Sequence, residues 1–276
     1  MAPGHPAPAI FFLSDYGLVD EFVGVVHAVI QRLVPGVPVI DLTHQVPSFG
    51  VVAAARVLER SVPHLGAGVV LAVVDPGVGS ERRGVAVEVG IEVGPHWLVG
   101  PDNGLLLPAA DLLGGPRRAV VLEGVSTFDG RDVFAPAAAH LVGGGSPEAL
   151  GGPADVATLV ALPDGRAEVS VTDGVVTTSV SWVDGYGNVQ LAGPVHIWEE
   201  AGVVLGATMM VELGGSHGGH RARARRVSAF SSLAPDELGV VLDANGHHAL
   251  ALDRASAASA LGGAVSGTEV RVRVVG

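Results

Sequence analysis

The chain has 276 residues and a formal net charge of −12, and it contains neither cysteine nor lysine. Without cysteine it has no disulfides, thiol nucleophiles or thiolate metal ligands, and without lysine it has no Schiff-base chemistry and no lysine-dependent phosphate loop. The acidic balance disfavours a general nucleic-acid binder, which needs a basic face.

The hydropathy indicates a large core and no membrane span. Hydrophobic residues make up 48% of the chain, and the mean hydropathy is +0.46. No apolar run approaches the roughly 18 residues that cross a bilayer. Residues 1–8 lack the positively charged start of a signal peptide. We therefore expect a soluble, cytoplasmic protein without a membrane partner.

The first part of the chain alternates short apolar strands with helical patterns. Strands are predicted at 9–13, 37–42, 68–74, 85–89 and 97–100. Helices are predicted at 21–33, 49–61 and 131–141. This alternation favours an α/β N-terminal domain with a central, mostly parallel sheet.

The pattern changes after the three glycines at 143–145, where residues 147–164 are expected to form a polar connector. Short valine-rich segments then recur at 175–183, 203–213, 240–243, 249–252 and 270–275. They predict a C-terminal, mostly β domain, a barrel or a sandwich, and a division into domains 1–165 and 166–276. The basic tract at 217–226 is expected to be a solvated loop, with contact to an anion or a partner as the alternative.

Acidic turns stand at the ends of the predicted strands and helices of the first domain. They contain Asp15, Asp75, Asp102 and Asp132. Because the carboxyl ends of parallel strands meet at one crevice, some of these carboxylates are expected to lie together. Asp75 precedes Arg82 by seven residues on a glycine-rich loop, and a guanidinium lowers the pKa of a neighbouring carboxyl. The alternative for an isolated Asp-Pro-Gly turn is a solvated surface loop.

A second group of polar residues lies in the β domain, where Asp184, Tyr186 and Asn188 follow one another closely. They suit a ligand that carries an ammonium, a base or a sulfonium. The alternative is an Asx turn between two strands, since Asp-Gly and Gly-Asn are hairpin signals. His44 and His140 are expected to be partly buried, satisfied histidines, and no spacing of histidines and acids predicts a metal site.

Six segments in order along the chain resemble the S-adenosylmethionine (SAM) hydroxide adenosyltransferases, the adenosine-forming SAM hydrolases related to the fluorinase and chlorinase. The segments are LSDYG at 13–17, VIDLTHQV at 39–46, VVDPGVGSERR at 73–83, VGPDNG at 99–104, STFDGRDVFAPAAAHL at 126–141 and DGYGN at 184–188. The resemblance implies an N-terminal α/β domain joined to a C-terminal β-barrel. It also implies a homotrimer with its ligand bound between one subunit's N-domain and its neighbour's C-domain.

The implied reaction is an attack of water or hydroxide on C5′ of the ribose of SAM, which releases methionine and leaves adenosine. It needs no cofactor, because a sulfonium is a good leaving group. What the protein must supply is an oriented, desolvated oxygen about 3–3.5 Å from the carbon.

By the same resemblance, Asp75 and Arg82 fall on two members of a water-orienting Asp-Arg-His triad. Asp129 stands where the family pattern Phe-His-Gly-Arg-Asp has histidine. One interpretation is that Asp129 still accepts a proton or a hydrogen bond from the water, with Arg82 offsetting the extra charge. The other is a silent protein that binds SAM or adenosine, since an ordinary aspartate is a weaker base than histidine at neutral pH. A halide-using enzyme is disfavoured because an anionic Asp129 would repel the halide.

The resemblance also assigns residues to the substrate. It implies that Asp15 holds the ribose hydroxyls and that Phe49 lies beside the ligand. The contacts to methionine or adenine fall to Asp184, Tyr186 and Asn188. Two further candidates, for the methionine carboxylate, are Asn245 and Arg254, because Ala244-Asn245 lies where the halogenases carry a Ser-Arg pair.

Overall fold

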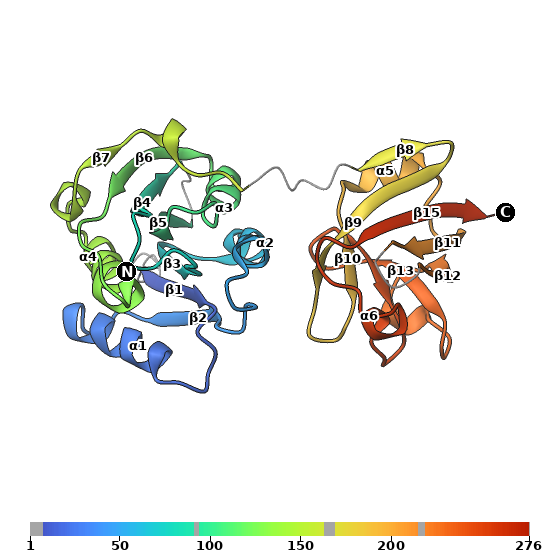
Figure 1. Cartoon of the computed structure of the whole chain (residues 1–276), viewed down its shortest axis with the longest axis horizontal. Coiled ribbons are helices and arrows are strands. Elements are labelled where there is room, and N and C mark those ends of the chain that lie inside the picture. The colour runs from blue at the N-terminus through green and yellow to red at the C-terminus, as the bar shows by residue number, and fades with distance from the viewer. Residues whose placement is uncertain (1–7, 91–93, 163–168, 215–218, 276) are drawn as a thin grey trace, which may run out of the picture. The chain divides into compact units, whose positions relative to one another are not determined.

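The computed structural model describes residues 8–90, 94–162, 169–214 and 219–275. The chain divides into two compact units, Met1–Pro163 and Asp164–Gly276 (Figure 1). The domain boundary predicted near residue 165 falls in 163–168, outside the described residues. No helix among the described residues is long and apolar enough to cross a membrane.

The described residues of the first unit form a seven-stranded sheet in the order β2-β1-β3-β5-β4-β6-β7. The parallel strands are β1 (Ala9–Ser14), β2 (Val39–Thr43), β3 (Gly68–Val73) and β5 (Pro95–Pro101). Antiparallel pairing adds β4 (Gly84–Val89), β6 (Pro116–Val121) and β7 (Pro153–Ala154). The predicted α/β domain with a central, mostly parallel sheet is confirmed.

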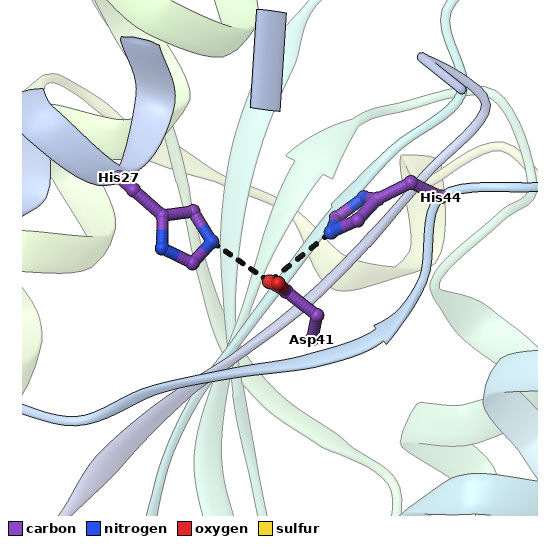
Figure 2. Close-up of side chains that lie close together, drawn as sticks. All are labelled: His27, Asp41 and His44. Carbon is purple, nitrogen blue, oxygen red and sulfur yellow. Dashed lines mark hydrogen bonds and ion pairs between the residues drawn. The ribbon is translucent and has the colours of Figure 1, made fainter. Parts of the chain in front are cut away.

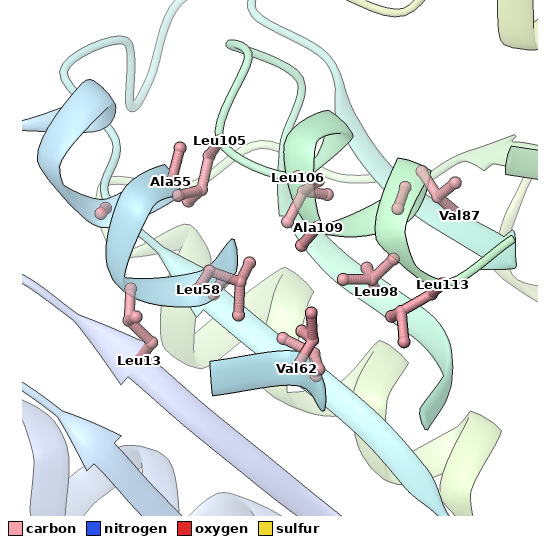
Figure 3. Packing of buried hydrophobic residues seen from close by; sticks show 14 of the residues in the cluster. Leu13, Ala55, Leu58, Val62, Val87, Leu98, Leu105, Leu106, Ala109 and Leu113 are labelled. Atoms are coloured by element: carbon pink, nitrogen blue, oxygen red, sulfur yellow. The ribbon is translucent and has the colours of Figure 1, made fainter. Parts of the chain in front are cut away.

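Helices cover both faces of this sheet (Figure 1). One face packs against α1 (Phe22–Leu33) and α4 (Ala135–Val142), and the other against α2 (Val51–Ser61) and α3 (Leu107–Leu112). Strand β1 contributes side chains to the hydrophobic clusters on both faces of the sheet. Phe12 belongs to the cluster with α1 and α4, while the adjacent Leu13 belongs to the cluster with α2 and α3, where it lies near Leu58 (Figure 3). Burial on both faces explains why these strands read as unbroken apolar runs.

The register of the sheet brings several loops to one edge. Strands β1, β3 and β5 are parallel, so the loops that follow them leave from the same edge. Strand β4 starts there as well, because Gly84 pairs with Pro101 at the end of β5. The two arginines that precede β4 are thereby carried to the loops after β3 and β5, the usual location of a ligand site in such sheets.

The connector after the three glycines is more structured than predicted. It contains two 3₁₀ turns, η3 (Pro147–Leu150) and η4 (Val156–Thr158), and between them β7, which pairs with β6 through Ala119 and Ala154. The prediction of a plain connector over 147–164 is therefore wrong for this short strand. A two-residue edge strand is too short to leave an alternating pattern in the sequence.

The described residues of the second unit form a closed β-barrel, so of the two predicted β architectures the barrel is the one found. Seven strands follow one another in the order β10-β14-β13-β12-β11-β15-β9, pairing of β9 with β10 closes the ring, and β8 is added outside β9. The strands are β8 (Ser170–Thr172), β9 (Val175–Val183), β10 (Val189–Leu191), β11 (Thr208–Leu213), β12 (His220–Arg226), β13 (Leu238–Leu242), β14 (His248–Ala251) and β15 (Glu269–Val275). Two short helices, α5 (Val195–Glu200) and α6 (Ala257–Ala260), complete the unit.

The basic tract does not form the solvated loop that was predicted. Its residues 220–226 are strand β12, which lies between β11 and β13, while residues 217 and 218 fall outside the described residues. Ala224 is buried in the barrel core, and the flanking Arg225 forms an ion pair with Glu237 at 2.6 Å. The alternation of arginine and alanine is thus the period of a strand with one buried face.

Candidate active site

The three residues predicted to be catalytic lie together at the edge of the sheet described above. Nε of Arg82 donates to Oδ1 of Asp75 at 3.0 Å, and Nη2 of Arg82 bonds to the other oxygen of that carboxylate. The same Nη2 also donates to Oδ2 of Asp129 at 2.6 Å. The side chains of Asp75 and Asp129 are each 6% exposed. One guanidinium thus holds two buried carboxylates, and the cluster carries one net negative charge when all three are ionised.

Backbone N–H groups also bond to the two carboxylates. Oδ1 of Asp75 accepts from Gly77 at 3.2 Å, and Oδ1 of Asp129 accepts from Ser126 at 2.7 Å. Burial raises the pKa of Asp75 above its usual value, although the charge and hydrogen bonds of Arg82 act in the opposite direction. A raised pKa makes Asp75 the better proton acceptor that a general base must be.

The residue after Asp129 is a glycine that packs closely against Tyr16. Gly130 begins a π-helical turn, η2 (Gly130–Phe134), which continues into α4. A Cβ at Gly130 would overlap the hydroxyl oxygen of Tyr16 and lie 3.0 Å from its ring carbon Cζ. Only glycine fits beside Tyr16 here, and π-helical turns of this kind are frequent at functional sites.

Tyr16 is a member of this site that the sequence did not single out. Its ring packs edge-on against Phe22 and Phe128, with ring centroids 5.8 and 5.5 Å apart. Burial, followed by the nearby charges of Asp15 and Asp75, raises the pKa of its hydroxyl. The hydroxyl therefore stays protonated and remains a hydrogen-bond donor beside the acidic cluster. The signal in the sequence is its place in the segment LSDYG at 13–17, directly after Asp15.

Two of the predicted substrate residues are joined directly. Oδ2 of Asp15 accepts the backbone N–H of Phe49 at 2.8 Å, just before α2 begins. Phe49 has φ of +64°, a left-handed conformation that non-glycine residues rarely adopt, and it is 72% exposed. Among the described residues, nothing donates a hydrogen bond to Oδ1 of Asp15, so this oxygen is available to a ligand hydroxyl.

The other two aspartates of the predicted crevice take part in separate ion pairs. Asp102 accepts from Nε of Arg83 at 2.9 Å and from the backbone N–H of Val160 at 2.8 Å, and so ties down the connector. Asp132 pairs with Arg131, whose hydrogen bonds lower the pKa of Asp132 to about 2. Asp15, Asp75 and Asp102 follow the parallel strands β1, β3 and β5 at the same edge of the sheet, and the charges of Asp15 and Asp75 both act on Tyr16.

In the barrel, Asp184 adopts the Asx-turn geometry that was the alternative interpretation. Its Oδ1 accepts the backbone N–H groups of Tyr186 and Asn188, each at 2.9 Å, and its Oδ2 accepts from Nδ2 of Asn188 at 2.8 Å. The turn presents Tyr186 at its tip with 85% exposure. Asn245 and Arg254 are exposed on other loops of the same unit.

A further polar cluster was not predicted from the sequence. His27 of α1, Asp41 of β2 and His44, the residue after β2, place their side chains around one carboxylate oxygen. The prediction of a partly buried, satisfied histidine is wrong for His44, which is fully buried and whose Nε2 has no hydrogen-bond partner among the described residues. It is confirmed for His140, which is partly buried and contacts the backbone carbonyl oxygen of Ser146 at 2.8 Å. Asp41 and His44 are three residues apart in the sequence, but His27 lies on α1 and joins them only in the fold.

Comparison with known proteins places the whole chain in one family. Residues 10–151 match the N-terminal domain of the SAM hydroxide adenosyltransferases, and residues 178–270 match the C-terminal domain. The chain is 45% identical to the (R)-S-adenosyl-L-methionine hydrolase of Salinispora tropica, over 93% of this chain and 95% of that protein. A fluorinase of Actinopolyspora mzabensis is 25% identical over 77% of this chain and 80% of the fluorinase.

Among solved structures, an uncharacterized conserved protein of Thermotoga maritima is similar to this chain with a TM-score of 0.84 and 31% identity. The match covers 96% of this chain and 99% of the Thermotoga chain. The likeness in sequence therefore extends to the fold.

Proposed function

Because this chain belongs to the SAM hydroxide adenosyltransferase family, we propose that it is an enzyme that hydrolyses SAM to adenosine and L-methionine. The observation that carries the proposal is the buried cluster in which Arg82 holds Asp75 and Asp129. The edge of the sheet where it lies is the usual ligand position in such folds.

The proposed reaction is an in-line displacement. The oxygen of a water molecule forms a bond to C5′ of the ribose, the C5′–S bond breaks, and its electron pair goes to sulfur, so methionine leaves as a neutral thioether. The water loses a proton to Asp75, whose pKa burial has raised above its usual value. No cofactor is needed to activate the leaving group, because the sulfonium already carries a positive charge.

Asp129 takes the position of the family histidine in this proposal. Arg82 offsets the charge of the second carboxylate, since its Nη2 bonds to both Asp75 and Asp129. Oδ1 of Asp129 accepts the N–H of Ser126, which fixes the orientation of its carboxylate. Two carboxylates repel a halide anion, which makes a halogenase the less favoured alternative.

The substrate contacts are proposed from the same geometry. The free Oδ1 of Asp15 suits the ribose hydroxyls, and the exposed ring of Phe49 suits a face of the ligand. The proposed contacts from the barrel are Asp184, Tyr186, Asn188, Asn245 and Arg254. We further propose the homotrimer that the family resemblance implies, in which the barrel of one copy completes the pocket of another.

The test is chromatography of SAM incubated with the wild type and with the Asp129→His and Asp75→Asn variants, with and without chloride. Adenosine from the wild type and little from Asp75→Asn is the expected result. Saturable SAM binding without product from the wild type, together with adenosine from Asp129→His, would mean that this chain is a silent binder. A chlorinated nucleoside would overturn the choice of water as nucleophile.

A further inference from the structure

The cluster formed by His27, Asp41 and His44 has the composition and the geometry of a metal-binding site. Figure 2 shows the two imidazoles converging on the carboxylate of Asp41 from either side. Oδ1 of Asp41 lies 2.8 Å from Nε2 of His27 and 3.1 Å from Nε2 of His44. One donor atom from each residue lies within 4.8 Å of the other two.

His44 is held rigidly, and one of its nitrogens makes no hydrogen bond among the described residues. Its side chain is 2% exposed, its ring packs edge-on against Phe12 with centroids 4.5 Å apart, and its Nδ1 lies 2.8 Å from Oγ of Ser14. The buried Nε2 faces Asp41 but is not aligned for a hydrogen bond, and it has no hydrogen-bond partner among the described residues. A buried side-chain nitrogen without a hydrogen bond is unusual in a native protein and calls for an explanation.

We propose that these three side chains bind one divalent transition-metal ion of the zinc type. Two imidazole nitrogens and one carboxylate oxygen are a ligand set that zinc uses, and the imidazoles disfavour magnesium and calcium. At zinc–ligand bonds near 2.1 Å in a tetrahedron, ligand atoms lie about 3.4 Å apart. The observed 2.8 and 3.1 Å need an expansion of only a few tenths of an ångström. Water would complete the coordination, since Asp41 and His27 are partly exposed.

Ser14 supports this assignment. A metal-ligating histidine usually engages its second nitrogen in a hydrogen bond that fixes the ring and its tautomer. The contact between Nδ1 of His44 and Oγ of Ser14 allows Nδ1 to carry the proton, and Nε2 then presents its lone pair to the cluster.

The proposed ion would stabilise the loop that carries Asp15 and Tyr16 without taking part in the reaction. Oγ of Ser14 accepts the N–H of Tyr16 at 3.3 Å, and the backbone carbonyl of His44 accepts the N–H of Gly17 at 2.7 Å. Fixing His44 would therefore fix both ends of the turn from Ser14 to Gly17. The metal site does not depend on the proposed function, because its three ligands lie outside the Arg82 cluster.

The test is calorimetric titration of Zn²⁺ into chelator-treated protein, with thermal unfolding beside it. We expect the wild type to bind one ion at this site, with a rise in Tm of about 5 °C when zinc exceeds its Kd a hundredfold. The His27→Ala variant should bind at least tenfold more weakly. His27 is partly exposed on a helix, so its replacement by alanine preserves the fold. His64→Ala, which removes an exposed histidine elsewhere in the same unit, is the matched control and should keep the wild-type affinity.

Two outcomes would overturn the proposal. If zinc produces neither heat nor a shift in Tm, the three side chains are joined only by their own hydrogen bonds and ion pairs and the cluster binds no zinc. If His27→Ala binds zinc as tightly as the wild type, the ion occupies other histidines. X-ray absorption of the zinc-loaded wild type gives a readout independent of both stability and activity. It should show imidazole nitrogens at about 2.0–2.1 Å that diminish in His27→Ala but not in His64→Ala, and a first shell without imidazole contradicts the assignment.

Discussion

Replacing Gly130 with alanine is expected to destabilise the first unit by about 1–2 kcal/mol. The new methyl would overlap the hydroxyl oxygen of Tyr16 and lie 3.0 Å from its Cζ and 3.2 Å from Cε2 of Phe128. Inserting a methyl into such a packed site costs about 1–3 kcal/mol, and the higher helix propensity of alanine returns up to about 1 kcal/mol. The loss arises from one atom in particular, the Tyr16 oxygen.

The Tyr16→Phe variant therefore provides the control. It removes the overlapping oxygen, and among the described residues that oxygen makes no hydrogen bond, so the single change should have a small effect. In the double variant the nearest contact becomes the ring carbon at 3.0 Å, which a small ring shift relieves. We expect a coupling free energy of at least about 1 kcal/mol between the two changes.

Native-state hydrogen exchange on peptides from β1 and β3 is the appropriate assay, because these strands report on the first unit alone. We expect the double variant to recover at least half of the protection that Gly130→Ala loses. The reasoning is refuted if Gly130→Ala is as stable as the wild type, or if adding Tyr16→Phe restores less than half of the lost stability.

Three further predictions concern charged groups. Arg82→Met should lower the free energy of unfolding by about 3 kcal/mol and abolish turnover, because it leaves the buried Asp75 and Asp129 without their cation. Urea unfolding measures the stability and chromatography of the products measures the turnover, and near-wild-type stability would contradict the role of Arg82. The kcat/KM should fall in acid at a pH above the usual carboxyl value of 3.8, because the pKa of Asp75 is raised. A raised pKa means that the folded state binds the proton more tightly than the unfolded state. The wild type should therefore lose stability relative to Asp75→Asn as the pH rises through that pKa, and a loss of stability as the pH falls would contradict the raised pKa. Asp184→Ala should destabilise the barrel by about 1–2 kcal/mol, because the turn loses the acceptor for the N–H groups of Tyr186 and Asn188. Hydrogen exchange in β9 and β10 measures the loss, and unchanged protection would show that the turn is stable without the Asp184 carboxylate.

The sequence predicted the fold well where burial leaves a strong pattern. The apolar run ending at Val74 corresponds to β3, and the valine-rich segment 175–183 corresponds to β9. Strand β6 was missed because Arg117 and Arg118 break its apolar character. Strand β12 was missed because its arginines dominate the composition, although its alternating alanines carry the strand period.

The candidate site was predictable as far as local sequence reaches. Asp75 and Arg82 lie on one loop, and the charge pattern of that loop indicated their pairing. Asp129 lies 47 positions from Arg82 and was assigned only through the family resemblance. Tyr16 and His27 acquire their roles from neighbours on other elements, and no local pattern records such contacts.

The central claim is that water attacks C5′ of SAM at the Asp75–Arg82–Asp129 cluster. Mass spectrometry of the products formed in ¹⁸O-labelled water tests it most directly, with the Asp75→Asn variant as the matched control. The account predicts adenosine that carries one ¹⁸O at its 5′ position, unlabelled methionine, and a large loss of labelled adenosine in Asp75→Asn. Adenosine without the label, or the same yield from Asp75→Asn, would contradict it.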